Sequence, residues 1–211
     1  MSVFEELAIA RFIAIARRVP IDRIVPCAEA VADAGVTFLE ITFDPSDPGT
    51  LADTAAKVRA VRRALPKMHV GCGTVLNVEM ADTAAGAGAE YLVAPNTKQA
   101  VIGRAHKHGL PMIPGAYTPT EIADAYDMGA DLVKIFPVPP GAESYVKNVM
   151  SPLSHIPFIV TGGINPDTIH SMLATGAAAV AAGASILRAD LVAAGNYAEI
   201  TALARKHLEN M

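Results

Sequence analysis

The chain has 211 residues, of which 52% are hydrophobic and 18% are charged, and its 17 basic and 21 acidic side chains give a net charge of −4. This length and composition predict one ordered globular domain over residues 1–211. The acidic balance without a basic stripe argues against a nucleic-acid partner, and no apolar run reaches the roughly 18 residues of a membrane span. Two cysteines without metal-type spacing, and an N-terminal segment unlike a secretory signal, predict a cytoplasmic protein that binds a small molecule.

Short apolar strands alternate with amphipathic helices along the chain, after a short N-terminal helix over Val3–Ala10. The predicted strands are Phe12–Ala16, Phe38–Phe43, Val70–Gly73, Tyr91–Ala94, Met112–Pro114, the stretch around Lys134, Phe158–Thr161 and Ala179–Ala182. The predicted helices are Ile21–Ala34, Thr50–Leu65, Val78–Ala87, Lys98–His108, Thr120–Met128, Glu143–Met150, Pro166–Ala174 and Tyr197–Leu208.

Strict alternation of strands and helices predicts a parallel sheet. Eight β–α units in about 200 residues predict that the sheet closes into an α/β, (β/α)8 TIM barrel. The alternative is a doubly wound open sheet. Such a sheet usually carries G-x-G-x-x-G after its first strand, where this sequence has Arg17-Arg18-Val19-Pro20.

The sixth predicted strand is unusual because it holds a lysine within the apolar run Asp131–Pro137. Side chains alternate along a strand, so Val133 and Ile135 share an apolar face and Lys134 lies on the other face. If helices cover the apolar face, Lys134 points into the barrel, where loss of hydration favours a neutral, nucleophilic amine. The alternative is a strand-end lysine whose stem packs while its ammonium reaches water.

The second predicted strand carries a carboxylate on the corresponding face. Leu39 and Ile41 would face the helices, so Glu40 would face inward. A buried glutamate beside Lys134 is suited to proton transfer around an amine nucleophile. The alternative is an ion pair that only fills the barrel.

Glycine-containing loops follow the seventh and eighth predicted strands, as Thr161-Gly162-Gly163-Ile164 and Ala182-Gly183-Ala184-Ser185. In (β/α)8 barrels these two loops form the recurrent phosphate site, because glycine lets backbone N–H groups approach an anion. One Gly-Gly pair alone would also suit a tight turn. The two loops together predict phosphate binding.

No metal and no cofactor are predicted. The six histidines include no pair at helical i,i+4 spacing and none at a predicted strand end beside a carboxylate. The other lysines fall on predicted helices or loops, where a solvated position is usual. The catalytic prediction therefore rests on Lys134 and Glu40.

Six motifs occur in an order that resembles one known family over nearly the whole chain. They are Leu39–Phe43, Gly73–Leu76, Val93–Pro95, Ile113–Gly115, Val133–Pro137 and Thr161–Ile164. The chain resembles the class I 2-keto-3-deoxy-6-phosphogluconate / 4-hydroxy-2-oxoglutarate aldolases. The resemblance implies a lyase of carbohydrate metabolism that cleaves a 2-keto-3-deoxy-4-hydroxy acid to pyruvate and an aldehyde, without a cofactor and as a homotrimer.

The resemblance also implies roles for single residues. Lys134 would form a Schiff base with the keto carbon of pyruvate, and Glu40 would move protons during carbinolamine formation and carbon–carbon cleavage. The pyruvate pocket would be lined by Thr74, Pro95, Phe136 and Thr161. The distal phosphate would be held by Gly162, Gly163 and Ser185, with Gly183 in the second glycine loop.

The chain departs from the family pattern in three places. Asp44 stands where the family usually has an arginine that grips the substrate carboxylate and hydroxyl. Arg17, at the end of strand one, is the expected substitute, because its planar fork could hold the carboxylate while pairing with Asp44. The alternative for Arg17 is a solvated arginine after a strand. The family's Gly-Gly-Ser is Gly183-Ala184-Ser185 here, and the loop Val138–Glu143 lacks the usual glycine pair before a lysine.

Two other functions stay open on the sequence. One is an aldolase acting on a different keto substrate, which Asp44 favours. The other is a phosphosugar-binding or epimerase-like barrel without aldolase activity. An epimerase would need metal ligands at strand ends, and a pure binding protein would not need Lys134 together with Glu40, so the aldolase is preferred.

Overall fold

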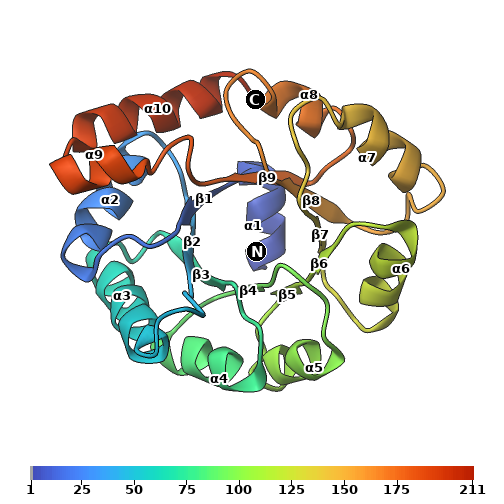
Figure 1. The fold of residues 1–211 in the computed structure, drawn as a ribbon, viewed down its shortest axis with the longest axis horizontal. Helices are drawn as coiled ribbons and strands as arrows, with labels where there is room; N and C mark the ends of the chain where they lie inside the picture. The colour runs from blue at the N-terminus through green and yellow to red at the C-terminus, as the bar shows by residue number, and fades with distance from the viewer. Residues whose placement is uncertain (1) are drawn as a thin grey trace.

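The computed structural model describes residues 2–211, and Met1, the first residue of the predicted domain, lies outside them. Parallel strands form a ring that helices surround (Figure 1). The strands are β1 (Phe12–Ala16), β2 (Phe38–Thr42), β3 (His69–Gly73), β4 (Leu92–Val93), β5 (Met112–Ile113), β6 (Gly115–Ala116), β7 (Val133–Ile135), β8 (Phe158–Thr161) and β9 (Ala179–Ala182). The helices are α1 (Val3–Ala10), α2 (Ile21–Asp33), α3 (Thr50–Ala64), α4 (Val78–Ala87), α5 (Gln99–Lys107), α6 (Pro119–Asp127), α7 (Glu143–Met150), α8 (Ile169–Leu173), α9 (Ala189–Ala194) and α10 (Tyr197–Glu209).

The strands pair in the order β5-β4-β3-β2-β1-β9-β8-β7-β6. The fifth predicted strand is divided into β5, which pairs with β4, and β6, which pairs with β7. Pro114 lies between the two segments and has no N–H, so a continuous ladder cannot run through it. Its carbonyl accepts a hydrogen bond from the Lys134 backbone N–H at 2.8 Å. Taken together, β5 and β6 serve as one barrel strand, and the predicted (β/α)8 barrel is confirmed.

The helix α1 lies within the ring of strands when the barrel is viewed along its axis (Figure 1). Its start is fixed by a capping box, in which Ser2 Oγ accepts from Glu5 N–H and the Glu5 carboxylate accepts from Ser2 N–H. Leu7 packs against the apolar side chains inside the barrel, and Glu6 binds His69 Nε2 at 2.8 Å. Because His69 is the first residue of β3, α1 closes the N-terminal end of the barrel, and the site lies at the other end.

Two apolar layers follow from the alternation along each strand. The outer layer, between strands and helices, includes Leu39, Ile41, Val133 and Ile135. The inner layer fills the barrel and includes Leu132. The side chain between those of Val133 and Ile135 therefore points inward, which places the amine of the sixth predicted strand inside the barrel as expected.

One helix was not predicted. The short helix α9 follows β9 and ends at Gly195, whose φ of 65° is the left-handed conformation that glycine adopts readily at helix ends. Because α9 stands beside the C-terminal end of the barrel, it contributes to the cavity described below. None of the helices in residues 2–211 is long and apolar enough to cross a membrane.

Candidate active site

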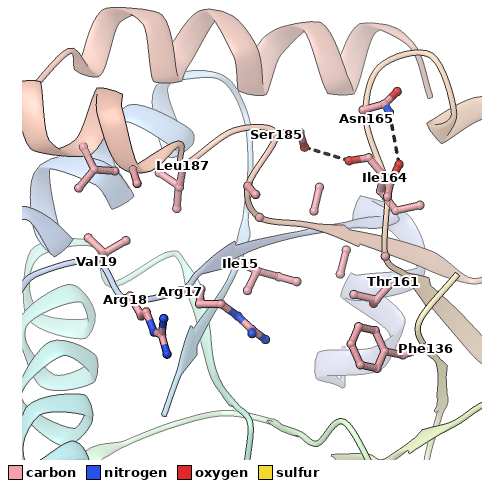
Figure 2. A pocket seen from close by; sticks show the side chains of 18 of the residues that line it. Ile15, Arg17, Arg18, Val19, Phe136, Thr161, Ile164, Asn165, Ser185 and Leu187 are labelled. Carbon is pink, nitrogen blue, oxygen red and sulfur yellow. Dashed lines mark hydrogen bonds between the residues drawn. The ribbon is translucent and has the colours of Figure 1, made fainter. Parts of the chain in front are cut away.

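A cavity of about 760 Å³ opens at the C-terminal ends of β1, β7, β8 and β9 (Figure 2). Most of the predicted site residues line it, namely Arg17, Lys134, Phe136, Thr161, Gly162, Gly163, Gly183 and Ser185. The three predicted residues Glu40, Thr74 and Pro95 are not part of this lining. The structure therefore brings the predicted nucleophile and the two glycine loops to one cavity.

Lys134 is buried on β7, with 5% of its surface exposed. This excludes the alternative in which its ammonium reaches water. Burial lowers the pKa of the amine, the charge of Glu40 acts in the opposite direction, and the charge of Arg17 lowers the pKa further. Because its pKa is lowered, Lys134 is neutral at a lower pH than an ordinary lysine, and a neutral amine is the nucleophilic form. Its Nζ lies 5.0 Å from the ring centroid of Phe136.

Glu40 is buried inside the barrel on β2, with 2% of its surface exposed. Gly73 on the neighbouring strand makes room for it, because a Cβ at this position would overlap the Glu40 carboxylate. Within residues 2–211, Glu40 Oε2 has no hydrogen-bond partner, so the carboxylate acts on Lys134 through space rather than by a direct bond at this oxygen. Buried polar atoms are normally paired. This oxygen is therefore an exception among the buried polar atoms of the described residues.

Thr161, at the end of β8, also carries a buried polar atom that lacks a partner. Its Oγ1 is buried and has no hydrogen-bond partner among the described residues, although the residue lines the cavity. Thr74 follows β3 with a φ of 59°, a left-handed conformation that a β-branched residue rarely adopts. Strain of this kind persists where the surroundings enforce it, often at functional sites. Pro95 lies at the end of β4, where its carbonyl packs so closely on Gly115 that a Cβ there would overlap it.

The glycines after β8 are required by close packing. Gly162 has a φ of 116°, and a Cβ there would lie 2.7 Å from the Val138 nitrogen. Gly163 has a φ of 59°, and a Cβ there would lie 2.5 Å from Pro140 Cδ. Both contacts are with the loop that follows β7, so the loop after β8 can reach this position only with glycine. The backbone of this loop is thereby exposed to the cavity.

Arg17 and Arg18 behave differently, although they are neighbours. Arg18 Nε donates to Asp44 at 2.8 Å, so the predicted pairing of Arg17 with Asp44 is wrong. Hydrogen bonds from Ser46 and from Arg18 lower the pKa of Asp44 to about 2. Figure 2 shows Arg17 extending from the end of β1 toward Phe136 and Thr161, whereas Arg18 turns away from them. Arg17 forms no ion pair with another side chain of residues 2–211.

The physical reason for this difference lies in the backbone. Arg17 continues the alternation of Ile13 and Ile15 and falls on the inward side. Arg18 has a left-handed φ of 54°, so the chain turns here and its side chain meets the loop after β2. Asp44 is held in that loop by Ser46 Oγ at 2.6 Å and by Ser46 N–H at 3.1 Å. The carboxylate is absent from the cavity lining.

Sequence reasoning did not identify the apolar side of the cavity, which is formed by Val19, Leu187 and Val192. Val192 belongs to α9, the helix that was not predicted. Ile15 also lines the cavity and could have been found, because it lies two residues after Ile13 on the inward face of β1. Leu187 and Val19 are in connections whose course the strand pattern does not define.

Known proteins resemble this chain in sequence and in structure. The family model of KDPG and KHG aldolases matches residues 3–203. The chain is 31% identical over 210 residues to the 2-dehydro-3-deoxy-phosphogluconate aldolase of Treponema pallidum (strain Nichols), covering 99% of this chain and 97% of that protein. It is 31% identical over 186 residues to the KHG/KDPG aldolase of Escherichia coli (strain K12), covering 88% and 84%. The crystal structure of the 2-keto-3-deoxy-6-phosphogluconate aldolase of Zymomonas mobilis ZM4 with 3-phosphoglycerate superposes with a TM-score of 0.82, at 25% identity, covering 99% of this chain and 96% of that one.

The barrel, the buried amine at its C-terminal end and these relatives define an enzyme, a carbon–carbon lyase of the aldolase class. The chain belongs to the KDPG and KHG aldolase family.

Proposed function

We propose that this protein cleaves a 2-keto-3-deoxy-4-hydroxy acid, 2-keto-3-deoxy-6-phosphogluconate or 4-hydroxy-2-oxoglutarate, to pyruvate and an aldehyde. One observation carries the proposal. Lys134 is a buried lysine with a lowered pKa that lines the cavity, and the carboxylate of Glu40 acts on it electrostatically. An amine in this state is the nucleophile that a keto carbon requires.

The reaction begins when the neutral Lys134 amine adds to the keto carbon and gives a carbinolamine. Loss of water then gives a protonated Schiff base, which draws the electrons of the breaking C3–C4 bond. The 4-hydroxyl loses its proton as the aldehyde leaves, and the remaining enamine gains a proton at C3 before hydrolysis releases pyruvate. Glu40, with an unpaired buried oxygen, is the group that moves these protons.

The two charged ends of the substrate are assigned to different parts of the cavity. Arg17 holds the carboxylate, because it is a cation of the lining without an ion-pair partner among the described residues. Thr74, Pro95, Phe136 and Thr161 surround the pyruvate portion. The loops of Gly162–Gly163 and Gly183–Ser185 hold the distal phosphate through backbone N–H groups. The Z. mobilis relative with 3-phosphoglycerate supports a phosphorylated ligand.

Asp44 does not favour a different keto substrate. Its carboxylate pairs with Arg18 and lies outside the cavity lining, so it does not repel an anionic substrate directly. The resemblance further supports a homotrimer in the cytoplasm, with residues 1–211 as a single domain. Light scattering on the purified protein tests the trimer, and a monomer would refute it.

The function is tested by incubating the protein with pyruvate and borohydride, followed by peptide mass spectrometry. One covalent adduct on Lys134 is expected, because its burial lowers the pKa of its amine. Lys134→Ala should lose both the adduct and the turnover. Labelling of a lysine on a surface helix, or unchanged trapping in Lys134→Ala, would show that the nucleophile is another residue.

A further inference from the structure

Behind the second glycine loop, a buried histidine contacts the serine that faces the cavity. Ser185 Oγ lies 2.9 Å from His207 Nε2 on α10 and 2.9 Å from the carbonyl oxygen of Ile164 in the first glycine loop. His207 Nδ1 lies 2.7 Å from the carbonyl oxygen of Leu203. His207 is fully buried, with 0% of its surface exposed. The contacts join α10 to both loops of the proposed phosphate site.

The partners determine where the protons lie. The Leu203 carbonyl can only accept, so His207 Nδ1 carries a hydrogen. Burial lowers the pKa of His207, which keeps the ring neutral and leaves Nε2 as an acceptor. Ser185 has one hydroxyl hydrogen and two acceptors, His207 Nε2 and the Ile164 carbonyl. With neutral His207, this hydrogen is used inside the protein, and the hydroxyl offers a bound anion only its lone pairs.

We propose that His207 is a positioning residue that couples anion binding at the two glycine loops to the uptake of one proton. When His207 gains a proton at Nε2, this N–H donates to Ser185 Oγ. The Ser185 hydroxyl hydrogen then has only the Ile164 carbonyl as an acceptor inside the protein, and it can turn from this carbonyl toward a more strongly accepting tetrahedral dianion in the cavity. The proton comes from solvent and returns to it when the anion leaves. This inference rests on the proposed phosphate site.

Apart from a bound anion, the described surroundings of His207 contribute little charge that would change its protonation state. Lys206, next to it on α10, is the charged residue among positions 2–211 whose field affects the ring, and it lowers the pKa of His207. The ring of Phe12, on β1, lies 6.0 Å away and carries no charge.

The helices that pack most extensively against α10 are α2 and α9. Arg23 on α2 donates to the Tyr197 hydroxyl at 3.3 Å, and Asp190 on α9 pairs with Arg188 at 2.7 Å. Burial raises the pKa of the Cys27 thiol on α2 to about 11, so this thiol stays neutral. A dianion bound at Ser185 would therefore be the main new charge that the ring meets, and it favours the imidazolium form.

The direction of the pH dependence follows from linkage. The anion prefers the protonated ring, so the pKa of His207 rises when the anion binds. Affinity is highest at low pH and falls as the pH rises through the interval between the free and bound pKa values. The total change in anion affinity between low and high pH should be about ten- to a hundredfold, which is the contribution of a hydrogen bond to a charged group.

Sulfate is the suitable probe, because it stays a dianion over the range from about pH 5.5 to 8.5 in which a histidine titrates. Sulfate binding is measured by calorimetry in two buffers of different ionisation enthalpy, and the ring is followed by nitrogen NMR. We expect uptake of up to one proton and a shift of the His207 signals from the neutral Nδ1–H form to the imidazolium. Because both measurements use the wild-type protein, they do not depend on a variant that folds.

The matched variant is His207→Gln, whose side-chain amide can donate to Ser185 Oγ at every pH. Its sulfate affinity should be independent of pH, and pyruvate trapping at Lys134 reports separately that the variant is folded. Sulfate binding without proton uptake, or the same pH dependence in both proteins, would overturn the role of His207 but leave the anion site intact. Absence of sulfate binding in both proteins would refute the anion site itself, while trapping at Lys134 would still stand.

Discussion

Replacing Arg17 by alanine removes a cation from the cavity without touching the Lys134 amine or the Glu40 carboxylate. Arg17 extends toward Phe136 and Thr161, and its charge lowers the pKa of Lys134 (Figure 2). Two effects are therefore expected from one substitution. The substrate carboxylate loses a charged partner, and the nucleophile loses a positive neighbour.

The first effect can be given a magnitude. A hydrogen bond to a charged group contributes about 1.5–3 kcal/mol, which corresponds to about a ten- to hundredfold loss in kcat/KM. The second effect has a direction. Without the Arg17 charge, the pKa of Lys134 moves up toward its ordinary value, so a smaller fraction of the amine is neutral at a given pH. The rising acid limb of the profile of kcat/KM against pH should therefore move to higher pH in Arg17→Ala.

The assay is the release of pyruvate from 4-hydroxy-2-oxoglutarate, which has no phosphate, over a range of pH values. Arg18→Ala is the matched control, because Arg18 also borders the cavity but is 69% exposed and is already paired with Asp44. Exposed ion pairs contribute about 0.2–1 kcal/mol, so the control should lose no more than about fivefold. Equal losses in the two variants would refute the assignment of Arg17 to the carboxylate. An acid limb that stays in place in Arg17→Ala would refute the effect of its charge on the pKa of Lys134.

Three further substitutions test other parts of the site. Glu40→Gln should lower turnover by about 10²–10⁴-fold, the usual contribution of a positioned acid–base group, and an unchanged rate would leave Glu40 as a packing residue. Gly73→Ala should cause a loss of the same kind, because its Cβ displaces the Glu40 carboxylate, whereas Gly86→Ala, whose Cβ meets no atom within 4 Å, should not. Gly163→Val should raise KM for 2-keto-3-deoxy-6-phosphogluconate by about ten- to a hundredfold and spare pyruvate trapping, since a Cβ there overlaps Pro140 in the loop after β7 and displaces the backbone proposed to hold the phosphate. Equal losses on phosphorylated and unphosphorylated substrates would contradict a phosphate site at Gly163.

The barrel could be predicted because apolar residues recur with a regular period along its strands and helices. Alternation along β7 was enough to direct Lys134 inward, and the same argument places Glu40 on the inner side of β2. Both side chains are defined by their own strand, and each is more than nine-tenths buried. Candidate catalytic groups on barrel strands can thus be predicted from the sequence, because a shift of one residue along a strand decides which face a side chain lies on.

Features that depend on contacts between loops were not predictable in this way. The pairing of Arg18 with Asp44 joins residues 26 positions apart, and either of two adjacent arginines satisfied the sequence pattern. The helix α9 has six residues, too few for a helical period to be visible. The interruption at Pro114 was present in the sequence, but its effect on the ladder depends on how β5 and β6 find different neighbours.

Asp44 shows how the charges of the site are divided. A carboxylate at the cavity edge would oppose an anionic substrate, yet here it is bound by Arg18 and Ser46 and leaves Arg17 without a competing partner in the described chain. Before substrate binds, the Arg17 charge favours a neutral Lys134, which is the form that attacks. If Arg17 then binds the substrate carboxylate as proposed, its charge is compensated, and the penalty on a positive nitrogen at Lys134 is reduced. One arginine therefore favours the amine for attack and, once bound to substrate, no longer opposes the cationic Schiff base that cleavage requires.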